Sequence, residues 1–135
     1  MVRDDRSELK LLNEEAFRAE ARQPIAGKTW REYLDELLDE TFVLRRSRAD
    51  RENEDKAAML RAIDQVERPP ERTLLRDSVR VWSSDTLGVV SSTVTLPADG
   101  ETKAFANVQV FTRSEGGGWR CVHWQVSPCP LPPAE

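Results

Sequence analysis

The spacing of hydrophobic residues divides the chain into a helical first half and a β-rich second half. The first apolar stripe repeats at intervals of three and four residues and comprises Leu9, Leu12, Ala16, Phe17 and Ala19. Such spacing predicts an amphipathic helix, for which Ser7 is the candidate N-cap. Pro24 and Gly27 predict the end of this helix.

Two more helices and a short strand are predicted before residue 70. The second helix has Thr29 as its candidate N-cap. Its apolar stripe consists of Trp30, Leu34, Leu37 and Leu38, with Tyr33 at the flank. Residues 41–45 are β-rich and predict a short strand. The third helix has Asn53 as its candidate cap and ends at the Pro69-Pro70 pair. Its stripe consists of Ala57, Met59, Leu60 and Ile63.

From Glu71 onward the hydrophobic period becomes two, which predicts strands. Val79 and Val81 alternate with their neighbours, and turn signals then separate further β-rich runs over 87–96, 103–113 and 119–127. Strands joined by tight turns pair as antiparallel neighbours. Pro128 and the prolines after it predict that pairing ends there.

The predicted architecture is one α+β domain over residues 1–128, followed by a Pro-rich tail over 129–135. Three N-terminal helices should pack on one face of an antiparallel sheet, because helices segregate to one face in α+β domains.

Composition limits the partners. The 135 residues suit a single core, and a net charge of −4 supplies no general basic field, so no nucleic acid is expected. No apolar stretch is long enough to span a membrane, and the charged N-terminus lacks a secretory h-region. We therefore expect a cytoplasmic protein with no membrane partner. The arginines at 45, 46, 48 and 51 are interrupted by acidic residues, and we interpret them as a solvated loop in preference to the alternative, an anion site.

The residues that ligate metals are few. The chain has two cysteines, Cys121 and Cys129, and one histidine, His123. No Cys-x-x-Cys pair is present, so no zinc site can be built from the spacing. We expect no metal and no cofactor, and we interpret Cys121 as a packing residue and Cys129 as part of the tail.

Two stretches carry a resemblance to a known superfamily. The first is LLDETFVL over 37–44, followed by the helix start over 56–63; the second is VFTR over 110–113, a glycine loop, and WRCVHWQVSP over 119–128. With the order of the elements, they make residues 7–128 similar to the nuclear transport factor 2-like superfamily. Within it, the nearest branch is that of small bacterial SnoaL-like, ketosteroid isomerase-like domains of unknown function.

The resemblance implies a strongly curved antiparallel sheet that forms a cone-shaped half barrel with a pocket. It also implies a homodimer through the outer face of the sheet. The superfamily includes isomerases, cyclases, dehydratases and non-catalytic binding modules, so the fold does not identify an activity.

Several polar residues that relatives use are replaced in this chain. The general-base aspartate of the steroid isomerases falls near Arg45, which cannot accept a proton. Gln125 stands where the branch often has a histidine, and Ala106 is the nearest match to an arginine of the preceding strand.

His123 is the main candidate for acid/base chemistry. Strict alternation places it on one sheet face with Cys121 and Gln125, opposite Trp124. The more apolar face should meet the helices, which sends His123 outward, and we favour such a structural or interface role. The alternative is a general acid/base in the pocket beside a carboxylate, for which Asp50 is the candidate.

Large side chains and one amide are expected at the ligand pocket: Phe17, Trp30, Tyr33, Phe42, Trp82, Phe105, Trp124 and Gln125. Packing in the core explains the helical aromatics among them, and some core residues would also line the pocket. Trp82 and Trp124 would either sandwich an apolar ligand or be buried at a dimer interface.

Three functions remain open. The favoured one is a dimeric module that binds a small hydrophobic ligand, because the core is ample while the acid/base set is depleted. The second is an isomerase, cyclase or dehydratase that transfers a proton on a polyketide- or steroid-like substrate, using His123 and one carboxylate without a metal. The third is a dimerisation domain whose cone is filled by side chains.

Overall fold

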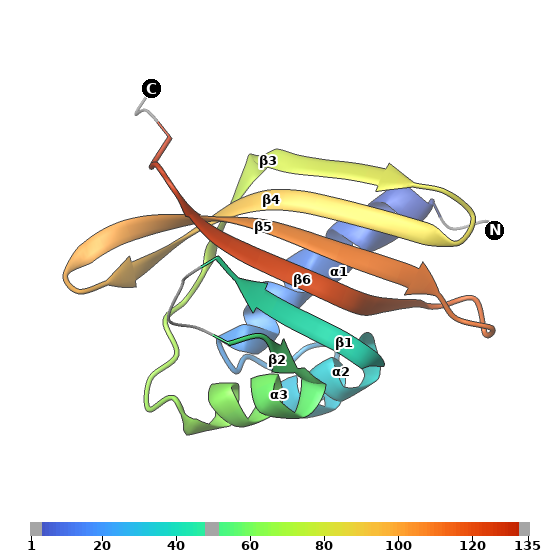
Figure 1. The fold of residues 1–135 in the computed structure, drawn as a ribbon, viewed down its shortest axis with the longest axis horizontal. Helices are drawn as coiled ribbons and strands as arrows, with labels where there is room; N and C mark the ends of the chain where they lie inside the picture. Colours follow the sequence, from blue (N-terminus) through green and yellow to red (C-terminus); the bar gives the residue numbers. More distant parts are fainter. Residues whose placement is uncertain (1–3, 48–51, 133–135) are drawn as a thin grey trace.

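The computed structural model describes residues 4–47 and 52–132, which form three helices and one six-stranded sheet (Figure 1). The elements follow the chain as α1 (Asp5–Glu20), α2 (Trp30–Leu37), β1 (Leu38–Arg46), β2 (Glu54–Asp55), α3 (Lys56–Gln65), β3 (Thr73–Ser83), β4 (Leu87–Ala98), β5 (Glu101–Arg113) and β6 (Trp119–Cys129). The strand order is β2-β1-β6-β5-β4-β3. The predicted α+β class is confirmed.

Four strands form the predicted meander. The pairs β3–β4, β4–β5 and β5–β6 are all antiparallel. In the turn between β4 and β5, Asp99 and Gly100 have φ values of 52° and 77°. Two positive φ values match the twist of tight hairpin turns, which is why this sequence reverses the chain here.

One strand pair departs from the antiparallel prediction. β1 pairs with β6 in parallel, with Val43 opposite His123 and Arg45 opposite Gln125. No tight turn joins these two strands, so the chain connection does not impose an antiparallel direction. β1 is also longer than predicted, since Leu38, expected in the second helix, is its first residue.

The first two helices begin at side-chain caps. Asp4, rather than Ser7, caps α1, because its carboxylate accepts a backbone N–H, while Ser7 lies inside the helix and donates to Asp4. Thr29 caps α2 as predicted, and Glu32 completes a capping box with it.

The third helix starts two residues later than predicted. Asp55 is its N-cap instead of Asn53, and both residue types suit that position. The side chains that α3 buries are Met59, Leu60 and Ile63. Ala57 is exposed, which shows that the stripe begins with Met59.

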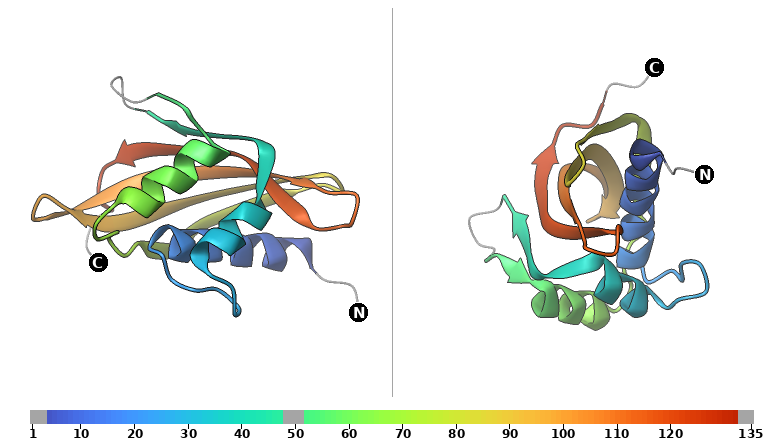
Figure 2. Two further views of the ribbon diagram at one scale, coloured as in Figure 1. Left: turned by 90° about the horizontal axis from the view of Figure 1, so that it is seen from below. Right: turned by 90° about the vertical axis from the view of Figure 1, so that its right-hand side faces the viewer.

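α1 packs against the inner face of the sheet. It contacts β3 and β4, and Gly88 of β4 lies so near that a Cβ atom there would be 2.6 Å from Leu9 Cδ1. Farther along α1, the ring of Phe17 meets that of Trp124 edge-on, with the centroids 5.6 Å apart. Figure 2 shows the sheet curving towards α1, whereas α2 and α3 lie beside β1 and β2.

A bulge in β6 changes which side chains share a face. Val110 pairs with His123, but Phe111 pairs with Cys121, so β6 carries one extra residue between them. As a result Cys121 and Trp124 are both fully buried. The strict alternation that grouped Cys121 with His123 is therefore wrong.

β6 also continues past its predicted end. Pro128 pairs with Phe105, and Cys129 pairs with Ala104. β1 does not reach this far, so β6 is an edge strand here and the missing N–H of Pro128 breaks no ladder bond. The prediction that pairing stops at Pro128 is wrong. The division into a domain over 1–128 and a tail over 129–135 remains a prediction.

Candidate functional site

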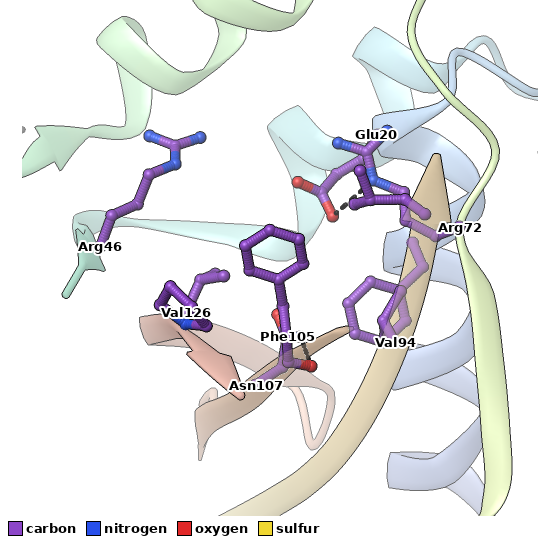
Figure 3. A pocket seen from close by; sticks show the side chains of 10 residues that line it. Glu20, Arg46, Arg72, Val94, Phe105, Asn107 and Val126 are labelled. Atoms are coloured by element: carbon purple, nitrogen blue, oxygen red, sulfur yellow. Dashed lines mark hydrogen bonds and ion pairs between the residues drawn. The ribbon is translucent and has the colours of Figure 1, made fainter. Parts of the chain in front are cut away.

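A cavity of about 180 Å³ lies between the end of α1 and the inner face of β4, β5 and β6 (Figure 3). It is lined by Phe17, Glu20, Arg46, Arg72, Val94, Leu96, Phe105, Asn107, Val126 and Pro128. Cavities that hold drug-sized ligands measure roughly 300–1,000 Å³, and an engineered cavity of about 150 Å³ binds benzene. The space therefore suits a single ring or a short chain.

The wall of the cavity is mainly apolar and its floor is polar. Phe105 projects into the centre of the space in Figure 3, with Val94 and Val126 beside it. On the floor, the Oδ1 atom of Asn107 accepts a hydrogen bond from Trp124 Nε1 at 2.8 Å, and its Nδ2 atom donates to the Phe105 carbonyl at 3.2 Å. These two bonds fix the orientation of the amide, and its second N–H donates to no residue of the described part of the chain.

Three charged residues from distant parts of the chain form the rim. Glu20 ends α1, Arg46 ends β1, and Arg72 precedes β3. Arg72 Nε lies 3.6 Å from Glu20 Oε1, and the same guanidinium donates to the carbonyl of Pro70 at 2.6 Å. Arg46 is paired with Glu54 of β2. The rim therefore holds two positively charged side chains and one carboxyl, and Glu54 pairs with Arg46 from β2.

Burial changes the protonation of Glu20. The side chain is 12% exposed, and it accepts no hydrogen bond from residues 4–47 or 52–132. Desolvation raises the pKa of its carboxyl, although Arg72 and, less strongly, Arg46 act in the opposite direction. Glu20 therefore keeps its proton to a higher pH than a solvated glutamate does.

A pair of buried amide side chains joins α1 to β5 beside the cavity. Asn13 of α1 donates from Nδ2 to Gln109 Oε1 at 2.8 Å, and both residues are fully buried. Ser92 is buried as well and stands opposite Asn107 in the ladder. Asn13 Oδ1, Gln109 Nε2 and Ser92 Oγ find no hydrogen-bond partner within the described part of the chain. The inner face next to the cavity is thus more polar than the hydrophobic pattern predicted.

Two of the residues expected at the pocket, Phe17 and Phe105, line this cavity. Trp124 lies beneath it and is coupled to it through Asn107. The residues Trp30, Tyr33 and Phe42 do not line it and instead belong to the core beside α2 and β1. Their elements, α2 and β1, pack against each other and against β6.

The other expected residues lie on the opposite face of the sheet. His123 stands in register with Val43 and Val110, while its neighbour Trp124 is buried on the inner face. Gln125 follows on the same outer side, and Trp82 is 57% exposed. His123, Gln125 and Trp82 therefore do not reach the cavity. Asp50 lies outside the described residues.

The sequence did not reveal the charged rim. The interpretation of Arg46 as part of a solvated loop is wrong, since Arg46 ends β1 and its side chain is 25% exposed. A usable signal existed for Glu20, which falls four residues after Ala16 and so continues the buried stripe of α1 with a charged residue. Nothing in the sequence distinguished Arg72.

Two other kinds of feature are missing from the described residues. They contain no group of three His, Cys, Asp or Glu side chains that could hold a metal ion. Within 4–47 and 52–132, no helix combines the length and hydrophobicity required to cross a membrane.

Comparisons with known proteins show the fold. No family model matches the chain, and no curated protein matches it. A nuclear transport factor 2-like protein from Cytophaga hutchinsonii is 12% identical, with a TM-score of 0.77 over 94% of this chain and 100% of that one. The CaMKII hub of S. rosetta is 15% identical, with a TM-score of 0.74 over 96% and 100%. A ketosteroid isomerase candidate from Parabacteroides distasonis is 12% identical, with a TM-score of 0.69 over 93% and 89%.

Proposed function

Because this chain has the nuclear transport factor 2-like fold, which supports several functions, we propose that it is a homodimeric module that holds a small, largely apolar ligand. The observation that carries the proposal is the cavity of about 180 Å³, whose wall includes Phe17, Val94, Phe105 and Val126. In this proposal the sheet and α1 act as a cone-shaped half barrel, and the charged rim is its open end.

The size of the cavity favours a ligand of one ring. Burying one such ring against apolar side chains stabilises a complex by about 25 cal/mol per Å² of apolar surface, and the Asn107 amide can orient a carbonyl or hydroxyl group. A polyketide- or steroid-like molecule of several fused rings, the substrate class expected for the enzyme alternative, would exceed the space.

Binding of neutral single-ring probes tests the cavity. We expect benzyl alcohol and benzamide to shift the NMR resonances of Val94, Phe105 and Asn107. Val126→Phe should abolish these shifts, because the larger side chain fills the space. Gln125→Phe is the matched control, since the neighbouring residue points to the other face. Absence of binding, or equal binding to both variants, would contradict the proposal.

The outer sheet face is the proposed dimer surface. No helix of the described residues covers it, and two large apolar side chains are exposed on it: Trp82 at 57% and Val108 at 37%. An exposed apolar face of this kind usually marks a contact with a partner. His123 and Gln125 lie on the same face, which gives them an interface role.

Sedimentation analysis tests the dimer. Trp82→Asp should convert the dimer to a monomer, because it places a charge in the proposed apolar contact. Leu11→Asp is the matched control: Leu11 is 53% exposed, but it lies on α1, away from the sheet face. A wild-type monomer, or equal dissociation of both variants, would refute the proposed interface.

A second function, proton transfer on a small carbonyl compound, is favoured by one observation. Glu20 is a buried carboxyl with a raised pKa at the rim of an apolar cavity, which is the environment of an acid/base group. It would replace the predicted pair of His123 and Asp50, since His123 lies on the outer face.

Deuterium exchange separates this function from simple binding. If Glu20 abstracts protons next to a carbonyl, the protein should accelerate exchange at the α-carbons of cyclohexanone in D₂O, and Glu20→Gln should remove the acceleration. Glu15→Gln is a control on the same helix. No acceleration by the wild type would leave the binding module as the function.

A further inference from the structure

The cavity offers more than an apolar space, since its rim carries two guanidinium groups and one loosely paired carboxyl. Resting on the proposed binding function, we infer that the ligand is a small carboxylic acid whose carboxylate is bound at the rim by Arg72 and Arg46, with its ring or chain among Phe17, Val94 and Phe105.

Arg72 has donors to spare for such a ligand. Its Nη1 atom is used by the Pro70 carbonyl, and its Nε atom faces Glu20 at 3.6 Å, beyond hydrogen-bond distance. Within the described part of the chain no residue accepts a hydrogen bond from Arg72 Nη2. A planar guanidinium at the edge of a cavity binds a carboxylate through two parallel bonds. Arg72 is therefore positioned to bind the carboxylate of the ligand.

Arg46 approaches the rim from the opposite element. Figure 3 shows its guanidinium on the other side of Phe105 from Glu20 and Arg72. Its charge is felt at Glu20, so the two guanidinium groups act on the same region. Its partner Glu54 anchors it from β2. A carboxylate at the rim would thus lie in the field of two positive charges, of which only one has a firm counter-ion.

Glu20 explains how the rim remains stable without a ligand and still accepts an anion. In the free protein its carboxylate partly neutralises Arg72. When a ligand carboxylate arrives, Glu20 takes one proton from solvent and becomes a neutral acid, which can donate a hydrogen bond to the ligand. The charged groups that face it are Arg72 from the segment before β3 and Arg46 from β1; the residues of β4, β5 and β6 that line the cavity are uncharged.

Three other ligand types match the site less completely. A cation would meet two guanidinium groups and one proton-binding carboxyl. A neutral ring would contact the apolar wall but leave the two guanidinium groups of the rim without a ligand carboxylate. An anion without an apolar body, such as acetate, would leave Phe105 and its neighbours without a partner, so both parts of the site are occupied only by a ring or chain that ends in a carboxylate.

The test compares benzoate with benzamide, which has the same shape and no charge, by calorimetry at neutral pH. A charge-assisted bond contributes about 1.5–3 kcal/mol, so benzoate should bind about 10- to 100-fold more tightly than benzamide. Arg72→Gln should lower the affinity for benzoate and so remove this preference. Arg80→Gln, an exposed arginine on β3 outside the cavity, is the charge-matched control.

Proton uptake provides a readout that a structural role of Glu20 would not produce. Binding enthalpies of benzoate, measured in two buffers with different ionisation heats, should reveal uptake of up to one proton, and Glu20→Gln should abolish it. Circular dichroism of Arg72→Gln and Glu20→Gln establishes that both variants are folded.

The outcomes distinguish this inference from the function on which it rests. Equal affinity for benzoate and benzamide, with both lost in Val126→Phe, would overturn the carboxylate and keep the binding module. Acetate binding as tight as benzoate would overturn the role of the apolar wall. No binding by any probe would overturn both proposals.

Discussion

Helix α1 approaches β4 closely at Gly88, and this contact gives a prediction that can be calculated from the structure. Adding one methyl group, as in Gly88→Ala, would place a Cβ atom 2.6 Å from Leu9 Cδ1 and 3.0 Å from Leu9 Cδ2. Both residues are buried, so the leucine has little room to move aside.

Two effects of this substitution have opposite signs. Overpacking a core typically costs about 1–3 kcal/mol. Replacing glycine by alanine also restricts the unfolded chain, which stabilises the fold by about 0.4–1 kcal/mol where the backbone is compatible. Gly88 has no positive φ, so it is compatible. The net loss of stability should be about 1–2 kcal/mol, because the packing term is the larger.

A second glycine isolates the packing term. Gly116 has an unstrained φ, and a Cβ atom at this position would have no atom within 4 Å. Gly116→Ala therefore changes only the unfolded state, and the difference between the two variants should equal the cost of overpacking, about 1–3 kcal/mol. Urea denaturation followed by tryptophan fluorescence gives both free energies of unfolding.

The background variant Leu9→Val completes the test. It removes both Cδ atoms, so Gly88→Ala in this background should behave like Gly116→Ala. Equal free energies for the two alanine variants in the wild-type chain would refute the close approach of α1 to β4. A Leu9→Val background that failed to relieve the effect of Gly88→Ala would refute it as well.

Three further predictions concern buried groups. The folded-state pKa of Glu20 is raised, so ionisation of its carboxyl favours the unfolded chain. The free energy of unfolding of Glu20→Gln, relative to wild type, should therefore increase as pH rises from about 4. A difference in urea midpoints that does not change with pH would contradict this. Trp124→Phe leaves the Asn107 carbonyl oxygen buried without its donor and should cost at least about 1–3 kcal/mol in the same assay; a change near zero would argue against that bond. Burial raises the pKa of Cys121 to about 12, so iodoacetamide should label Cys129 first in the native protein, as mass spectrometry would show; rapid labelling of Cys121 would contradict the buried thiol.

Local signals in the sequence predicted most elements, because their causes lie within a few residues. Thr29 and Glu32 form a capping box from adjacent turns. Asp99 and Gly100 supply the positive φ values of a hairpin turn. Where two residues of similar chemistry competed for one position, as Asn53 and Asp55 did, the sequence located the helix start only to within two residues.

The faces of β6 could not be predicted from alternation. One extra residue between His123 and Cys121 reverses the order of buried and exposed positions on one side of the bulge. A bulge is stabilised by pairing with the neighbouring strand, and no composition cue in Val122 marks it. Trp124 was correctly expected to be buried, while Cys121 was grouped with the wrong face.

The sequence by itself determined the helices, the antiparallel meander and the resemblance to the nuclear transport factor 2-like fold, since hydrophobic period and turn chemistry are local properties of the chain. Only the tertiary structure decided the parallel pairing of β1 with β6 and the charged rim of the cavity. Glu20, Arg46 and Arg72 come from three separate segments, and only Glu20 carries a local signal, because it continues the buried stripe of α1. Their shared burial, and with it the raised pKa of Glu20, arises when the folded chain removes water from all three together.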